Sequence, residues 1–203
     1  MKALVKIWPM EIEGAEKTIR EIMVIVGYHI KSNFYLPLML NLLHSDEIKN
    51  SPKNTVILLK LIAYMLLKTE DISSHLPELT KLISTYEQHL LENDEGLVTV
   101  SQICINLINR LPNLDQPNLV STLFSVLLNV QSTKTIGLPN RSEAEEAMKV
   151  LAAKAGYTSV AELHSFEVGP TLAKLVESKE FTQWGKTTKN RFKFDTIVRN
   201  CQG

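Results

Sequence analysis

Residues 36–43 read Leu-Pro-Leu-Met-Leu-Asn-Leu-Leu, a proline followed by apolar residues at a spacing that recurs along the chain. Similar stretches begin at Leu76-Pro77 and Gln116-Pro117, so three prolines follow one another at intervals of 40 residues. A fourth copy, Gly169-Pro170, comes after a longer gap. Two places after these prolines stand Met39, Leu79, Leu119 and Leu172, and six places after them stand Leu43, Ile83, Leu123 and Val176. Because residues four apart share one face of a helix, we expect a buried helix face in all four copies.

A second helix precedes each of these stretches. Ile19, Ile22, Met23, Val26 and Ile30 recur at steps of three and four residues and predict a helix over about residues 11–31. Gly27 either weakens this helix by roughly 1 kcal/mol relative to alanine or permits a close neighbour. Ser51-Pro52 and Asp94 are suitable starts for the next two first helices.

Helix pairs that repeat about every 40 residues are typical of HEAT and armadillo arrays, whereas tetratricopeptide and ankyrin units are shorter. We therefore predict an all-α fold, a right-handed α-solenoid of stacked antiparallel helix pairs. The predicted repeats cover residues 11–45, 51–91, 94–131 and 141–178, with a partial fifth at 188–200. Since that last repeat lacks its second helix, we expect residues 1–203 to form one solenoid domain that is a piece of a longer array.

The fourth repeat is expected to depart from the regular pattern. A loop is predicted over residues 132–141, where the sequence turns polar. The pairs Ser142–Glu145 and Ser159–Glu162 match a helix capping box and predict helices over 143–155 and 160–166, ahead of the Pro170 helix.

Composition argues against several functional classes. The chain has 22 basic and 22 acidic residues, so it lacks the basic excess of a typical nucleic-acid-binding protein. Cys104 and Cys201 stand far apart and no signal peptide is recognisable, which disfavours a disulfide framework. The apolar run of residues 56–67 is too short to span a membrane and contains Lys60. We predict a soluble, cytoplasmic protein.

Catalytic and metal-binding motifs are not recognisable. Gly185-Lys186-Thr187 resembles the end of a phosphate-binding loop, but Glu180 stands where that loop requires glycine. The histidines form no HExxH pair and no cluster with cysteine; they are His29, His44, His75, His89 and His164. Three glutamates near residue 145 crowd a predicted helix start, where the helix dipole favours them. We predict a protein that is not an enzyme and needs no cofactor.

The remaining candidate for a functional site is a helix face. In stacked helical hairpins the second helices line up and form a concave wall. Residues one, four and eight places after each proline are predicted to face outward; in the first copy these are Leu38, Asn41 and Ser45. The predicted protein-binding residues are Asn41, Glu78, Lys81, Thr85, Asn118, Ser121, Ser125, Thr171 and Lys174. An ordinary solvated helix face is the alternative interpretation.

The residues after 178 combine basic and aromatic side chains. Lys189, Arg191 and Lys193 stand close to Trp184 and Phe192. This combination could bind single-stranded nucleic acid. A nucleic-acid-binding solenoid is therefore an alternative function. An amphipathic helix with a solvated basic face explains the same residues, and we adopt that interpretation.

Residues 156–170, Gly-Tyr-Thr-Ser-Val-Ala-Glu-Leu-His-Ser-Phe-Glu-Val-Gly-Pro, are followed by Arg-Phe-Lys-Phe-Asp at 191–195. The two stretches resemble the carboxy-terminal HEAT array of the cytoplasmic axonemal dynein assembly factor. The resemblance implies a non-enzymatic scaffold that supports preassembly of dynein arm complexes for cilia. Its partners would be dynein chains, chaperones or co-assembly factors. Another HEAT scaffold or adaptor, such as a kinase-stability cofactor or a nuclear transport adaptor, is the alternative.

Overall fold

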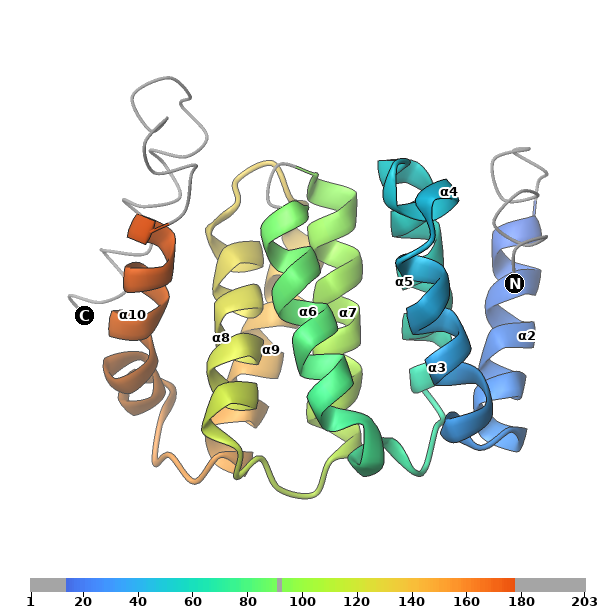
Figure 1. Cartoon of the computed structure of the whole chain (residues 1–203). Coiled ribbons are helices and arrows are strands. Elements are labelled where there is room, and N and C mark those ends of the chain that lie inside the picture. The colour runs from blue at the N-terminus through green and yellow to red at the C-terminus, as the bar shows by residue number, and fades with distance from the viewer. Residues whose placement is uncertain (1–13, 91–92, 178–203) are drawn as a thin grey trace. The chain divides into compact units, whose positions relative to one another are not determined.

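The described residues form an assembly of packed helices. A computed structural model of the chain describes residues 14–90 and 93–177, and no strand occurs among them (Figure 1). The prediction of an all-α fold is therefore confirmed, while the solenoid arrangement and the number of repeats stay predictions. The chain divides into two compact units, residues 1–82 and 83–203. The predicted partial repeat at 188–200 lies outside the described residues.

The first unit is organised around one apolar helix. Its elements are α2 (Ala15–His29), α3 (Ser32–Leu43), α4 (Asp46–Lys49), α5 (Pro52–Leu66), the 3-10 helix η2 (Ile72–His75) and the beginning of α6 (Leu76–His89). Helix α5 packs against α2, α3 and α4. Ser51 Oγ accepts a hydrogen bond from the backbone N–H of Asn54, so this serine caps α5 as predicted. Buried residues lie on most sides of α5, as expected for a helix enclosed by its neighbours.

Helices α2 and α5 approach each other closely at Gly27. A Cβ atom at this position would lie 2.0 Å from the backbone oxygen of Met65 in α5. No side chain fits in that space, so glycine is required here for packing. Gly27 therefore permits the close approach of a neighbouring helix, which is one of the two roles considered for it above.

The described part of the second unit contains residues 83–89 of α6 and four further helices. These are α7 (Asp94–Arg110), α8 (Pro117–Ser132), α9 (Leu138–Lys154) and α10 (Val160–Glu177). Helices α7, α8 and α9 pack against one another, and α10 packs against α8 and α9 (Figure 1). Cys104 is fully buried in α7.

The apolar positions that follow the repeated prolines are buried in the first three copies. The residues two and six places after those prolines each expose 1% or less of their surface: Met39, Leu43, Leu79, Ile83, Leu119 and Leu123. In the fourth copy the corresponding side chains lie outside the described residues. The predicted helix face is thus confirmed for α3, α6 and α8.

The four repeated prolines stand at different places in their helices. Pro117 begins α8 and Pro77 is the second residue of α6, but Pro37 and Pro170 lie inside α3 and α10. A proline inside a helix leaves one backbone carbonyl without its usual N–H donor. The carbonyl groups concerned belong to Asn33 and Phe166, which are both exposed residues, so water can reach them. The separate short helix expected at 160–166 is consequently the first part of α10.

Helix α9 begins earlier than predicted. It starts at Leu138, with Pro139 in its first turn, so the loop spans residues 133–137 and Ser142 lies within the helix instead of capping it. The second capping box is half formed. Ser159 Oγ accepts from the backbone N–H of Glu162 at 3.1 Å, but the Glu162 carboxylate accepts from the N–H and hydroxyl of Thr158.

Candidate functional site

The residues predicted to form a binding face differ in accessibility. Four of them are exposed, namely Asn41, Glu78, Lys81 and Asn118, and two are half-buried, Thr85 and Ser121. Ser125 and Thr171 are buried. The side chain of Lys174 lies outside the described residues. A partner that meets the native surface can reach only part of the predicted set.

Ser125 is buried because it joins a polar contact between α6 and α8. The Ser125 hydroxyl donates to Glu87 Oε1 at 2.6 Å, and the Asn129 amide donates to the same oxygen at 2.5 Å. Glu87 comes from α6, whereas Ser125 and Asn129 are four residues apart on one face of α8. A buried carboxylate requires such donors, so these side chains serve to hold the two helices together.

A second buried carboxylate connects α8 with α10. The hydroxyl of Ser121 donates to Glu167 Oε2 at 2.5 Å, and the Tyr157 hydroxyl donates to Glu167 Oε1 at 3.4 Å. Burial and the charge of Glu167 raise the pKa of Tyr157, which keeps this donor protonated. Thr171 bonds the backbone carbonyl of Glu167 at 2.9 Å. Ser121 therefore belongs to the α8–α10 contact, whereas the hydrogen bond of Thr171 stays within α10.

One sequence pattern indicates these buried carboxylates, and it is separate from the repeat of prolines and apolar residues. Helix α8 has no charged residue, yet Ser121, Ser125 and Asn129 recur at intervals of four along it. Hydrogen-bonding side chains in a stripe on an otherwise apolar helix indicate buried polar partners. The pattern does not say which residues those partners are, and Glu87 and Glu167 were not predicted.

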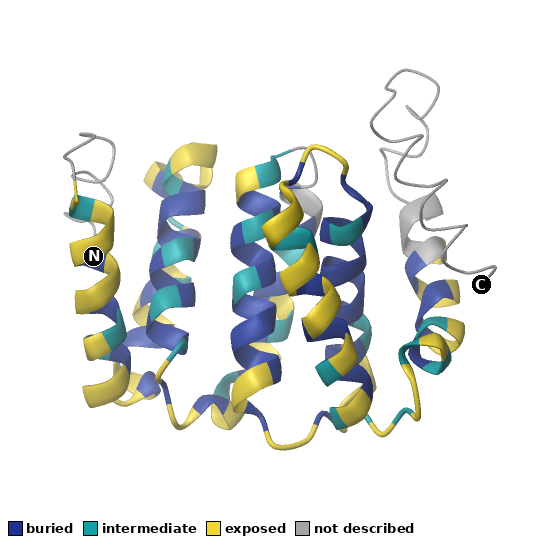
Figure 2. Cartoon of the chain, turned by 180° about the vertical axis from the view of Figure 1, so that it is seen from behind, coloured by how far each residue is buried: buried dark blue, intermediate teal, exposed yellow. Residues whose placement is uncertain are grey.

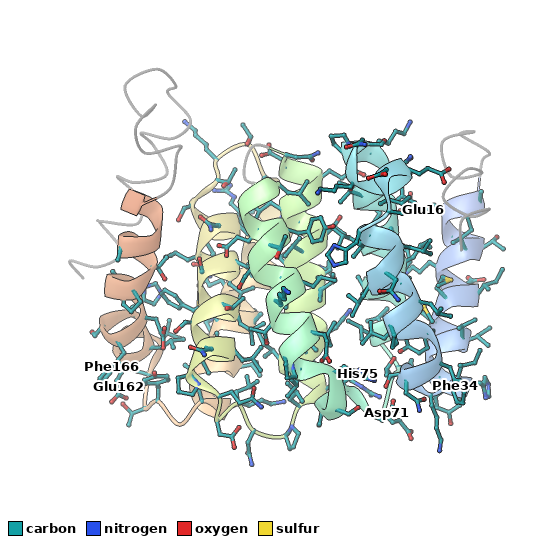
Figure 3. All side chains as sticks on the ribbon, in the orientation of Figure 1. Glu16, Phe34, Asp71, His75, Glu162 and Phe166 are labelled. Atoms are coloured by element: carbon teal, nitrogen blue, oxygen red, sulfur yellow. The ribbon has the colours of Figure 1, made fainter. Side chains whose placement is uncertain are left out.

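A cluster of exposed apolar side chains lies in the first unit. Six of the eight large apolar residues that are exposed in the described part of the chain belong to α2, α3 and their connection: Ile22, Ile25, Tyr28, Ile30, Phe34 and Leu38. We call this set the α2–α3 apolar surface. Figure 2 shows exposed residues along much of α2, next to the mark N, and Figure 3 shows Phe34 at the lower end of α3.

The α2–α3 apolar surface is turned away from α5. Helix α2 buries Ile19, Met23 and Gly27, and the last of these touches α5. Ile22 and Ile25 are three residues apart on another side of the same helix. On α3, Phe34 and Leu38 are four residues apart and lie opposite the buried residues. Both helices thus have a second apolar side that the fold leaves open.

Polar contacts attach the other edge of α2 to α5. Glu16 pairs with Lys60 at 3.5 Å and accepts a hydrogen bond from the Tyr64 hydroxyl at 3.1 Å (Glu16 is labelled in Figure 3). The guanidinium of Arg20 lies over the Tyr64 ring, 5.6 Å from its centroid. Helix α2 is therefore fixed to α5 by residues outside the α2–α3 apolar surface.

Three observations on the described residues concern thiol reactivity, metal binding and membrane insertion. Burial, together with the charge of Glu87, raises the pKa of the Cys104 thiol well above its ordinary value, which disfavours the nucleophilic thiolate. Within residues 14–90 and 93–177 no three histidine, cysteine or acidic side chains form a possible metal site. No described helix is long and apolar enough to cross a membrane. The Gly185-Lys186-Thr187 motif and the basic residues Lys189, Arg191 and Lys193 lie outside the described part.

Comparisons with protein-family models, with curated proteins and with solved structures find no match for this chain. The class is therefore defined by the structure alone. It is an all-helical protein in which two adjacent helices present exposed apolar side chains.

Proposed function

We propose that the protein is a non-enzymatic scaffold that binds a partner protein through the α2–α3 apolar surface. The observation that carries the proposal is the exposure of six large apolar side chains, between 43% for Ile30 and 66% for Phe34, on neighbouring elements. Grouped apolar side chains on a protein surface mark interaction sites, whereas scattered ones need no explanation. The grouping distinguishes this surface from Leu138 and Phe166, the other large apolar residues that are exposed in the described part.

The surface suits the apolar face of a helix in the partner. Ile22 and Ile25 on α2, and Phe34 and Leu38 on α3, supply apolar side chains from two consecutive helices. Helix-binding surfaces use such arrangements, because the partner's apolar residues at three- and four-residue steps can pack against them. Asn41 stands three residues after Leu38 and is also exposed, so this predicted binding residue provides a polar border.

The identity of the partner is a finer proposal that rests on sequence resemblance. Residues 156–170 and 191–195 support a role in the cytoplasmic preassembly of axonemal dynein arms, with dynein chains, chaperones or co-assembly factors as partners. A scaffold in such a process needs a binding surface and no reaction centre. Another HEAT-type scaffold or adaptor would use the same surface for different partners.

The test is affinity purification of the full chain from ciliated cells, comparing the wild type with two variants. Leu38→Lys places a charge within the α2–α3 apolar surface, and Leu138→Lys is the matched control, since these leucines are 64% and 67% exposed. We expect a dynein chain or chaperone to co-purify with the wild type and Leu138→Lys but not with Leu38→Lys.

The two levels of the proposal fail separately. If partners co-purify but none is a dynein chain or chaperone, dynein preassembly is rejected. If Leu38→Lys retains the partners of the wild type, the α2–α3 apolar surface is not the binding site. Circular dichroism of each variant checks that the helices are intact.

A further inference from the structure

His164 has an unusual position in the contact between α10 and α8. Its imidazole packs edge-on against the ring of Phe124 in α8, with centroids 5.0 Å apart and planes inclined by 82°. The Nδ1 atom is buried and has no hydrogen-bond partner. A neutral imidazole tolerates this position, because it carries only one N–H group. An imidazolium carries two, and one of them would be enclosed without an acceptor.

The helices around His164 offer little to compensate a positive charge. Helix α8 contains no acidic or basic residue. On α10 itself, the carboxylate of Glu162 accepts from Thr158, and that of Glu167 accepts from Ser121 and Tyr157. These carboxylates are therefore already engaged by other donors.

Helix α9, which also packs against α10, directs its charged groups elsewhere. Its exposed charged residues are Glu143, Glu145, Glu146 and Lys149, and its half-buried ones are Arg141 and Lys154. Lys149 pairs with Glu145 and Glu146, and Lys154 bonds carbonyl groups at the end of α7. Burial alone lowers the pKa of His164, in agreement with surroundings that hold no counter-charge for it.

We propose that α10 is a pH-sensitive helix that separates from α8 when His164 is protonated. A released His164 is hydrated and binds a proton more tightly than the packed one, so acid favours release. The packed state is fully favoured above the ordinary histidine value of about 6.5 and loses stability as the pH falls below it. Uptake of one proton changes the release equilibrium by at most about tenfold per pH unit.

Release would alter the accessible surface of α8. Ser121, which was predicted to bind a partner, now donates to Glu167 of α10. When α10 separates, this hydroxyl and the neighbouring part of α8 become reachable. Acidification would thus uncover a surface that the packed helix covers. This inference depends on the α8–α10 contact and is independent of the function proposed above.

The experiment is amide hydrogen exchange of the full chain between pH 7.5 and 5.5, corrected for the intrinsic effect of pH on exchange. In the wild type we expect the protection of α10 to fall by up to about tenfold per pH unit, relative to α7. His164→Gln cannot titrate and should abolish this dependence. His44→Gln, at an exposed histidine in the first unit, should retain it.

A direct titration of the His164 ring by NMR keeps the test decisive if His164→Gln fails to fold. We expect the wild-type ring to titrate below about 6.5. A pKa of the His164 ring at or above about 6.5 overturns the proposal. Pairing with Glu167 or attraction to the Phe124 ring would produce such a pKa. The proposal is also overturned if the protection of α10 against hydrogen exchange still depends on pH in His164→Gln.

Discussion

The Nζ atom of Lys154 lies 2.7 Å from the carbonyl oxygen of Leu111, the residue that directly follows the end of α7 at Arg110. The same ammonium donates to the carbonyl of Ile108 at 2.7 Å and to that of Asn109 at 3.3 Å. The last carbonyl groups of a helix lack internal donors and carry partial negative charge. Lys154, the final residue of α9, therefore caps α7 from a position more than 40 residues later in the chain.

Replacing this lysine should weaken the second unit. Lys154→Met keeps most of the apolar stem but removes the donors to three carbonyl groups. We expect the free energy of unfolding to fall by about 1–3 kcal/mol, the usual cost of losing hydrogen bonds to a charged donor. Urea denaturation measures the change. Lys149→Met is the control, because Lys149 lies on the same helix and makes only surface pairs with Glu145 and Glu146. Equal midpoints for the two variants would contradict the capping role.

Two glycines should respond to the same substitution to different extents. In Gly27→Ala the new Cβ would meet the backbone of Met65, and we expect destabilisation of about 1–3 kcal/mol from overpacking between α2 and α5. In Gly169→Ala the new Cβ meets no atom of a neighbouring helix, but it crowds the ring of Pro170, which offsets the gain in helix propensity. We therefore expect the stability to change by no more than about 1 kcal/mol. Thermal unfolding of both variants tests the pair, and a loss of stability at Gly169 as large as at Gly27 would refute the explanation.

The sequence of α2 shows how far periodicity can predict the fold. Ile19, Ile22, Met23, Val26 and Ile30 predicted one helix face, and the helix is present. Only Ile19 and Met23 of this set are buried, while Ile22 and Ile30 are exposed. The helix has apolar residues on two sides, and the position of α5 decides which side is covered. Periodicity therefore predicted the helix but not the candidate binding surface.

Helix boundaries were harder to predict where the deciding contact is distant in sequence. Helix α3 begins at Ser32, five residues before Pro37. The Ser32 N–H donates to Asp71 Oδ1 at 3.2 Å, and the Ser32 hydroxyl donates to the Asp71 carbonyl at 3.3 Å. A cap supplied by a residue 39 positions away leaves no local pattern at the start of the helix. Glu87 and Glu167 escaped prediction for the same reason, since each accepts hydrogen bonds from side chains on α8 that are far away in sequence.

The contact between α6 and α8 should depend on Asn129. Asn129→Leu removes one of the two donors that hold Glu87 Oε1 and leaves a buried carboxylate less well satisfied. We expect a loss of about 1–3 kcal/mol of unfolding free energy, measured by urea denaturation. Asn118→Leu, at an exposed position near the start of α8, should change stability by no more than about 0.5 kcal/mol. If both variants unfold at the same urea concentration, Glu87 does not need this donor.

The cap on α3 should make the stability of the first unit depend on pH in the acid range. Burial alone would raise the pKa of Asp71. The hydrogen bonds from Ser32, together with a smaller contribution from the backbone of Asp71 itself and from His75, outweigh burial and hold the pKa below its ordinary value. A folded-state pKa below the unfolded one means that Asp71 stabilises the fold above about pH 4, and that this contribution is lost as the pH falls further. In Asp71→Asn the titrating group is absent. The difference in unfolding free energy between wild type and Asp71→Asn should therefore shrink between pH 6 and pH 3. A difference that stays constant over this range would show that the Asp71 carboxylate does not cap α3.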